Sequence, residues 1–211
     1  MFDSRRYRPV DEQLVDGFLR TQRHGTLMGC APGESPQASI LPYLVTDSGD
    51  VELHFVRADA LFDAIVAAPK VSLLVDDFLA DTPHHWVDPV DGSESTLHFR
   101  AVLLQGTATL STDPDVVAAA LHRLVTAYGH GPDYRPVADD ELYGPDLRRL
   151  AVVTIAVEHR QAKFKVGMGS EAERLDLARR LRERGAPGDD RAADVVAELA
   201  PSRGGTVTPG A

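Results

Sequence analysis

The sequence predicts a mainly β protein with flanking helices, in the α+β class, whose strands curl into a small barrel. About six segments rich in apolar and β-branched residues are separated by turns, and few helical patterns interrupt them. Gly106 lies inside a long strand pattern, where a glycine permits the bulge that lets a sheet curl. We expect one domain over residues 1–199, including its C-terminal helices, and a disordered tail over residues 200–211.

The first half of the chain alternates helix and strand patterns. Apolar residues recur at helical spacing from Asp11 to Arg20, which predicts a short amphipathic helix. Strands are expected over residues 25–31 and 37–46, with P-G-E-S-P as the turn between them, and a third strand begins at Val51 after D-S-G-D. A helix over residues 58–67 and a buried strand over residues 70–77 follow.

The second half contains the longest strand patterns. Residues 77–95 are predicted to be irregular, and a long strand or bent pair is expected over residues 96–112. A helix follows Asp113 and ends at Gly129, and a polar connection over residues 130–146 leads to the last strand, over residues 150–166. Ser170 and Glu173 form a capping-box pattern for a helix over residues 170–184, and a last helix is expected over residues 189–199.

Charge limits the class of partner. The 211 residues carry a formal net charge of −10, with a pI near 5.2, and the short R-R-Y-R segment near the start does not offset this locally. A strongly acidic protein repels phosphate backbones and anionic lipid surfaces. We therefore expect a small-molecule substrate, with neither nucleic acid nor a membrane as partner.

Cysteine usage and the first residues indicate a compartment. Cys30 is the single cysteine of the sequence, which excludes an intramolecular disulfide and any site with several cysteine ligands. The first ten residues lack the apolar core of a signal peptide, and no apolar run approaches the roughly 18 residues that span a bilayer. We expect a cytoplasmic protein.

His54 is the first candidate for chemistry. The sequence contains no Gly-rich phosphate loop, nucleophile elbow or His-Glu-x-x-His motif. In V-E-L-H-F-V, strand alternation places Val51, Leu53 and Phe55 on one face and His54 on the other. A rigidly held imidazole with a free nitrogen can ligate haem iron, whereas a histidine in a strand is more often a half-buried, hydrogen-bonded structural residue.

Cationic and aromatic side chains near this strand and in the irregular segment are further candidates. Arg57 follows His54 at a predicted helix start, where it could bind an anion with help from exposed backbone N–H groups. Trp86 follows two adjacent histidines and could stack on a planar cofactor or pack beneath a loop. The adjacent histidines, His84 and His85, would point to opposite sides of a strand, which disfavours a shared metal.

Two strands carry paired candidates. His98 and Arg100 share one face of the strand T-L-H-F-R-A-V, and Phe99 lies opposite. In K-F-K, Lys163 and Lys165 share a face in the same way. These side chains predict a groove more cationic than the protein as a whole, suited to a carboxylate or phosphate, although cations at strand edges are commonly just solvated.

Five short motifs occur in a recognisable order: Y-R-P-V-D-E, Q-A-S-I-L-P-Y-L, L-H-F-V-R-A-D, H-H-W-V-D-P and K-F-K-V-G-M-G-S-E-A-E-R. Their order resembles the FMN-binding split β-barrel superfamily, which includes the pyridoxamine phosphate oxidases, and within it the PaiB-like FMN-binding negative transcriptional regulators. The resemblance covers about residues 2–185. It implies a split β-barrel, and it matches His54 and Arg57 to a His-x-x-Arg-x-Asn motif, with Asp59 where asparagine is usual.

Two departures shift the expected cofactor. T-L-H-F stands where the group has Thr-Trp-Asn-Tyr, and Met168 and Gly169 stand where it has Gln-Asn. An offshoot of the group, the piperazate synthases of natural-product and antibiotic pathways, uses haem b in place of flavin and the strand histidine as iron ligand. The resemblance implies His54 as the metal ligand, with N5-hydroxy-L-ornithine cyclised to L-piperazate by N–N bond formation and loss of water.

Further residue roles follow as hypotheses under this resemblance. Arg57, Trp86 and Lys165 would contact the cofactor. His98 or Lys163 would keep the attacking α-amine neutral, and Arg100 would hold the substrate carboxylate. Two alternatives stay open: an FMN-binding split-barrel regulator or flavin oxidoreductase, and a haem-binding or haem-degrading split-barrel protein. A homodimer is expected, because the groove on such a barrel is often completed by a second subunit.

Overall fold

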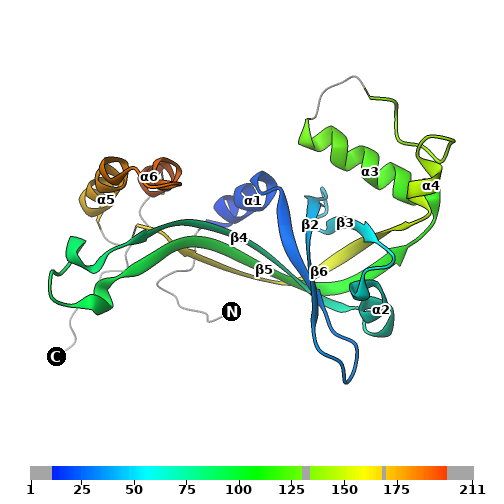
Figure 1. The fold of residues 1–211 in the computed structure, drawn as a ribbon, viewed down its shortest axis with the longest axis horizontal. Helices are drawn as coiled ribbons and strands as arrows, with labels where there is room; N and C mark the ends of the chain where they lie inside the picture. The colour runs from blue at the N-terminus through cyan, green and yellow to red at the C-terminus, as the bar shows by residue number, and fades with distance from the viewer. Residues whose placement is uncertain (1–10, 130–133, 168–169, 199–211) are drawn as a thin grey trace. The chain divides into compact units, whose positions relative to one another are not determined.

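The computed structural model describes residues 11–129, 134–167 and 170–198. The chain forms two compact units built from interleaved segments (Figure 1). The barrel unit contains Asp16–Val75 and Val102–Gln161, and the second unit contains the described parts of residues 1–15, 76–101 and 162–211. The expected single domain over residues 1–199 stays a prediction, and the predicted tail over residues 200–211 lies outside the described residues.

Six strands form a closed barrel in the order β1-β2-β3-β6-β5-β4, which confirms the predicted mainly β barrel. The strand bounds are β1 His24–Gly29, β2 Gln37–Val45, β3 Val51–Val56, β4 Lys70–Thr82, β5 Thr96–Ser111 and β6 Leu150–Lys165. The determined pairings of β1 with β2 and β4, and of β3 with β2 and β6, are all antiparallel. β1, β2 and β3 follow one another through short connections at the predicted turns P-G-E-S-P and D-S-G-D.

The interior of the barrel follows the alternation of β3. Val51, Leu53 and Phe55 are 0–3% exposed, whereas Glu52 and His54 are partly exposed on the other face. The partners of the inward residues on β6 are likewise buried, because directly opposed residues of an antiparallel pair share a face. The predicted facing of His54 is therefore confirmed.

Helices pack against the barrel sheet. In the barrel unit, α2 (Ala60–Ala67) contacts β1 and β2, and α3 (Pro114–Tyr128) contacts β2, β3 and the short helix α4 (Gly144–Leu147). An apolar cluster beneath α3 and α4 contains Val117, Ala118, Ala120, Leu147 and Val152. Asp113 caps α3 by accepting a hydrogen bond from the Asp115 N–H at 3.0 Å, and Gly129 ends the helix in a left-handed conformation.

Gly106 is needed because β5 and β6 approach closely. A Cβ atom at this position would collide with the carbonyl oxygen of Ala156 and would lie 3.1 Å from Cγ2 of Ile155. The glycine suspected from the sequence therefore has a steric role, since no side chain fits between the two strands.

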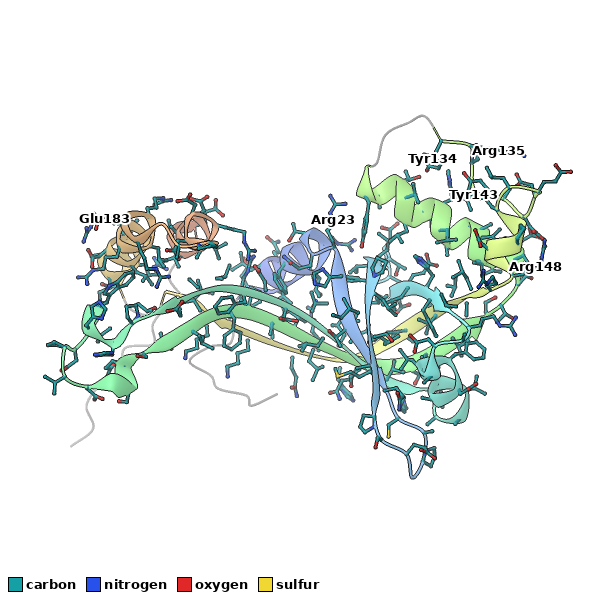
Figure 2. All side chains as sticks on the ribbon, in the orientation of Figure 1. Arg23, Tyr134, Arg135, Tyr143, Arg148 and Glu183 are labelled. Carbon is teal, nitrogen blue, oxygen red and sulfur yellow. The ribbon has the colours of Figure 1, made fainter. Side chains whose placement is uncertain are left out.

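The connection after α3 is held by polar contacts in its described part. Figure 2 labels Tyr134, Arg135, Tyr143 and Arg148 along it. The Tyr143 hydroxyl donates to the Arg135 carbonyl at 2.8 Å, and Arg148 pairs with Asp139 at 2.8 Å. Val137 and Tyr143 of the same segment also pack against the apolar cluster beneath α3 and α4, so polar and apolar contacts together fix the connection.

The second unit joins strand ends to two helices. The apolar face of α5 (Glu171–Arg184) packs with α6 (Asp189–Glu198), and the two helices lie side by side in Figure 1. Their cluster includes Leu79 and Ala80 of β4 together with Ala178, Leu181, Ala192 and Val196. Ser170 and Glu173 form the predicted capping box at the start of α5.

One stretch differs from the sequence prediction. Residues 77–95 were expected to be irregular, but β4 continues to Thr82 and two short helical turns follow, His84–Trp86 and Gly92–Glu94. The acidic residues that interrupt the apolar pattern are tolerated in the strand, because Asp77 is paired and Asp76 is exposed. Among the described residues, no helix is long and apolar enough to cross a membrane.

Candidate functional site

His54 lies on the outer face of the barrel sheet, in the middle of β3. It is directly opposite Val152 of β6, and Val152 belongs to the cluster beneath α3 and α4. Glu52, on the same face, accepts two hydrogen bonds from Arg123 of α3, at 3.1 and 2.6 Å. The strand therefore holds His54 rigidly on the face that α3 covers.

The imidazole of His54 is suited to be a ligand. Burial lowers its pKa below the ordinary 6.5, and the Glu52 carboxylate opposes this shift, so the ring is neutral at neutral pH. Within the described residues, its side chain makes no hydrogen bond to the protein. A neutral imidazole with an available nitrogen is the form that binds iron.

Arg57 is exposed and lies three residues beyond His54. Its guanidinium carbon is 5.8 Å from the centroid of the Phe62 ring, and its backbone N–H donates to the Arg149 carbonyl at 2.8 Å. In the described part of the chain, no carboxylate forms an ion pair with Arg57. Its charge is therefore available to an anionic group such as a propionate or a phosphate.

The helix start beside Arg57 differs from the prediction. Asp59 caps α2: Oδ1 accepts the Leu61 N–H at 2.9 Å, and Oδ2 accepts the Ser39 hydroxyl at 2.7 Å. One of the backbone donors expected to help bind an anion is thus used by the protein. The carboxylate also adds a negative charge at the helix start, which disfavours a phosphate there.

Three of the predicted site residues line one cavity in the second unit. The cavity has a volume of about 650 Å³, within the usual range for small-molecule sites, and Trp86, His98 and Lys165 all line it. The ends of β4 and β6, the start of β5, the Trp86 turn and α5 form its walls. His54 and Arg57 belong to the barrel unit.

His98 is a buried, neutral histidine. It is 4% exposed, and burial, followed by the positive charge of Lys165, lowers its pKa from 6.5 to about 4. Nδ1 accepts the Gly167 N–H at 3.4 Å, so Nε2 carries the proton and donates it to the Thr82 hydroxyl. Both ring nitrogens are engaged, so the predicted role of His98 as a base would require one of these contacts to break.

The two lysines of K-F-K have different neighbours. Lys165 lines the cavity and acts electrostatically on His98. The Lys163 ammonium lies 5.6 Å from the centroid of the Phe99 ring, and Phe99 alternates with His98 along β5. The structure therefore does not support a single groove that receives both lysines.

Arg100 has a partner within the protein. Its Nη2 lies 2.5 Å from Oδ2 of Asp77, and the Asp77 side chain is 6% exposed. Arg191 of α6 binds the other oxygen of Asp77, also at 2.5 Å. The carboxylate predicted to come from a substrate is thus supplied by Asp77, and a ligand would have to compete with it.

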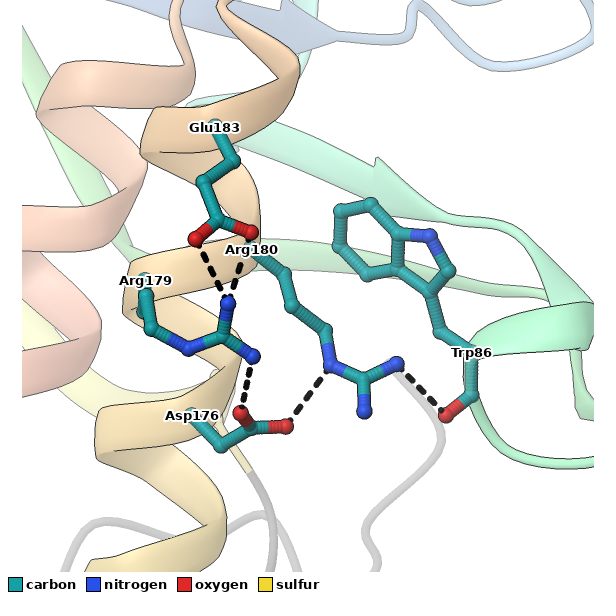
Figure 3. Close-up of polar contacts among 5 residues, drawn as sticks. All are labelled: Trp86, Asp176, Arg179, Arg180 and Glu183. Atoms are coloured by element: carbon teal, nitrogen blue, oxygen red, sulfur yellow. Dashed lines mark hydrogen bonds and ion pairs between the residues drawn. The ribbon is translucent and has the colours of Figure 1, made fainter.

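Trp86 is fixed by α5. The Arg180 guanidinium donates to the Trp86 carbonyl at 3.2 Å and to Asp176 at 2.7 Å, as Figure 3 shows. The Arg184 guanidinium carbon lies 5.3 Å from the centroid of the Trp86 ring. The first contact fixes the backbone of Trp86 against α5, and the second places a cation beside the indole, which is partly exposed.

The sequence did not reveal those residues of the cavity whose partners lie far away along the chain. Thr82 binds His98 from β4, and Arg180 reaches Trp86 across 94 positions of sequence. No spacing signal could have found these contacts. No group of three or more His, Cys, Asp or Glu side chains that could hold a metal ion occurs in residues 11–129, 134–167 and 170–198.

The fold is that of a split barrel, and comparison with known families agrees. The sequence model described as "Putative FMN-binding domain" matches residues 1–159. The chain belongs to this FMN-binding domain family. None of the curated proteins searched matches the chain.

Solved structures share the fold. The flavocytochrome Anf3 from Azotobacter vinelandii is 21% identical, with a TM-score of 0.60 over 78% of this chain and 73% of that chain. The FAD and haem binding protein from Mycobacterium smegmatis is 15% identical, with a TM-score of 0.60 over 78% of this chain and 77% of that one. The conserved hypothetical protein Rv2991 from Mycobacterium tuberculosis is 20% identical, with a TM-score of 0.56 over 80% and 95%.

Proposed function

We propose that this chain is a cofactor-binding split-barrel protein in which His54 ligates the iron of haem b. The observation that carries the proposal is the state of the His54 ring, which is neutral and makes no hydrogen bond to the described protein. Haem needs a single axial ligand from the protein, and a strand holds that ligand rigidly. One protein of the same fold is a flavocytochrome, and another is an FAD and haem binding protein. Both names are compatible with this proposal.

The residues around His54 fit the group in part. Arg57 offers an exposed cation that can bind a propionate, and the Arg123–Glu52 pair ties β3 to α3 on the same face. When bound, haem iron would supply a Lewis acid or redox centre. The protein's own contribution is to keep the imidazole neutral and oriented.

The finer proposal is dehydrative N–N cyclisation of N5-hydroxy-L-ornithine to L-piperazate. It rests on the sequence resemblance to the piperazate synthases. In this reaction the α-amine must be neutral to attack, and a neighbouring cation would lower the pKa of that amine. Neither His98 nor Lys163 is assigned as the base, because His98 is engaged at both nitrogens and Lys163 lies over Phe99.

FMN is the second candidate cofactor, and the family to which the chain belongs favours it. In that case Arg57 would bind the phosphate of the flavin. The Asp59 carboxylate at the start of α2 opposes such binding, because it brings a negative charge close to the same helix end.

The absorption spectrum of the purified protein, before and after addition of haemin, tests the proposal. We expect a Soret band that His54→Ala abolishes and that His24→Ala retains, since His24 is an exposed histidine at the first position of β1. Flavin bands without a Soret band would replace the haem proposal by the flavin one. If haem binds, conversion of N5-hydroxy-L-ornithine to L-piperazate, followed by mass spectrometry, decides the finer proposal.

A further inference from the structure

A different cavity lies in the barrel unit, near the end of α1 (Glu12–Thr21) and the start of β1. It has a volume of about 470 Å³, within the usual range for small-molecule sites. It is lined by residues 19–23, 43–45, 127 and 128, so α1, β2 and the end of α3 supply its walls. Figure 2 labels Arg23 at this place. His54 and the other predicted site residues do not line it, so it is a separate candidate site.

The backbone acceptors around this cavity are already used by the protein. The Tyr43 hydroxyl donates to the Leu19 carbonyl, and the Tyr128 hydroxyl donates to the Arg23 carbonyl. The Arg23 guanidinium donates to the Tyr128 carbonyl at 3.1 Å. Carbonyl groups at a helix end carry the negative end of the helix dipole, and these donors satisfy them. The backbone therefore offers little to a cationic ligand.

Both tyrosines of the cavity stay uncharged. Tyr43 is 2% exposed, and burial, followed by the electrostatic effect of Tyr128, raises its pKa well above the ordinary 10. Burial likewise raises the pKa of Tyr128. Neither phenol thus adds a negative charge to the cavity at neutral pH.

Two arginines of the cavity retain unused donors. Arg20 donates to the Val45 carbonyl at 3.1 Å and to the Thr46 carbonyl at 3.3 Å. The guanidinium carbon of Arg23 lies 4.7 Å from the centroid of the Tyr128 ring. A guanidinium has five N–H donors, so both side chains have N–H groups left for a ligand. Their partners are neutral carbonyls and a neutral ring, which leave both positive charges uncompensated.

No carboxylate of the described residues neutralises these two charges. Neither Arg20 nor Arg23 forms an ion pair with a described residue, and the described residues that line the cavity include no acidic side chain. Asp16, one turn before Arg20, is bound to Arg160. Asp47 borders a neighbouring cavity that Arg20 also lines, but it is not within ion-pair distance of Arg20. The balance of charge in this cavity is therefore positive.

We propose that this cavity binds a small oxyanion, the phosphate or carboxylate group of a small molecule, between Arg20 and Arg23. Contacts of arginine with these groups are short and strong because both partners are charged. The bound anion would connect the end of β2 with the end of α3, since Arg20 contacts the first and Arg23 the second. The proposal does not depend on the cofactor proposed for His54.

Isothermal titration calorimetry of the full-length protein tests the proposal with two probes, inorganic phosphate and acetate, at constant ionic strength. We expect saturable binding of at least one of them. Tighter binding of phosphate assigns a phosphate ligand, whereas equal or tighter binding of acetate assigns a carboxylate. Saturable binding of neither probe would overturn the proposal.

Arginine variants locate the bound anion. Arg20→Met and Arg23→Met should each weaken binding of the preferred probe about tenfold, the ratio for the loss of one charge-assisted contact. Arg20→Lys and Arg23→Lys keep the charge and should lose less affinity than the methionine variants. The matched control is Arg179→Met, which removes the same charge from a guanidinium that Asp176 and Glu183 already neutralise (Figure 3). We expect this control to bind the probe as the unsubstituted protein does.

Two results with the variants would also overturn the proposal. One is an unchanged affinity in both Arg20→Met and Arg23→Met, and the other is an equal loss of affinity in Arg179→Met. Circular dichroism of each variant verifies that it is folded. The titration is repeated with His54→Ala, which we expect to bind the probe with unchanged affinity. The result for the oxyanion is thereby separated from the result for the cofactor.

Discussion

The His98 ring is held in one protonation state by its neighbours. The Gly167 N–H points at Nδ1, which must therefore remain unprotonated to accept it. Lys165 on β6 and Arg184 on α5 add positive charge, whereas Asp81 on β4 opposes them. Protonation of His98 would put an N–H group on Nδ1, where it would face the Gly167 N–H. It would also add a positive charge close to Lys165 and Arg184.

A pH dependence of stability follows from this arrangement. The folded pKa of about 4 lies below the ordinary 6.5, so the unfolded chain takes up a proton first as the pH falls. The stability that neutral His98 contributes is therefore present in full above pH 6.5, and it is lost as the pH falls from 6.5 to about 4. From pH 7 to pH 5 the contribution of His98 should fall by about 2 kcal/mol.

Urea unfolding at pH 7 and pH 5 measures this loss. His98→Gln should show a smaller difference between the two pH values than the unsubstituted protein. His24→Gln, at an exposed strand end, should show an unchanged difference. An identical difference in the His98 variant and the unsubstituted protein would contradict the assignment.

At the scale of single residues, the sequence predicted what depends on local geometry. Strand alternation correctly placed His54 away from the barrel interior, and the Ser170–Glu173 pattern correctly predicted a capping box. The ion pair of Arg100 with Asp77 spans 23 positions and depends on how β4 and β5 align. The sequence carries no signal for that alignment, so Arg100 looked available to a substrate.

At the scale of elements, the close approach of β5 to β6 depends on Gly106. An added methyl group would meet the Ala156 carbonyl, which is backbone and cannot rotate away. Either the two strands separate or the strand pairing shifts locally, and both responses weaken the barrel.

We expect Gly106→Ala to lower the free energy of unfolding by about 2 kcal/mol or more, as overpacking usually does. Gly17→Ala is the control, because a Cβ at Gly17 of α1 (Glu12–Thr21) would meet no atom within 4 Å. That control should be stabilising by about 0.5–1 kcal/mol, since alanine favours a helix over glycine. Guanidinium denaturation of both variants measures the two effects, and equal stabilities would refute the steric role of Gly106.

Element prediction succeeded where the signal was local and failed where a partner strand decided the outcome. The expected helices correspond to α1, α2, α3, α5 and α6, whose caps and spacing lie within each segment. The continuation of β4 to Thr82 was missed, because Asp76 and Asp77 break the apolar pattern. Pairing within the sheet and the ion pairs of Asp77 override that local pattern.

At the scale of the whole molecule, the homodimer remains a prediction, and the mass of the protein in solution tests it. Phe78 of β4 is 56% exposed and Leu97 of β5 is 52% exposed. By strand alternation, both lie opposite residues that face the α5–α6 cluster or the cavity, namely Leu79 and His98. Two large apolar side chains that are exposed among the described residues favour association with a second copy.

Light scattering after size-exclusion chromatography should give about twice the 22.8 kDa mass of the chain. The double variant Phe78→Asp, Leu97→Asp should give the single mass, because charged residues disfavour burial in an interface. A single mass for the unsubstituted protein at every concentration would exclude the dimer.

The order of strands in the barrel has a consequence for biosynthesis. β6, which begins at Leu150, lies between β3 and β5 and is the last strand of the closed barrel to be synthesised. During translation the barrel cannot close until this late strand has left the ribosome, and residues 162–198 of the second unit emerge later still. The edges of β3 and β5 that will pair with β6 remain unpaired during that interval. The nascent chain is therefore most prone to aggregation just before β6 is synthesised.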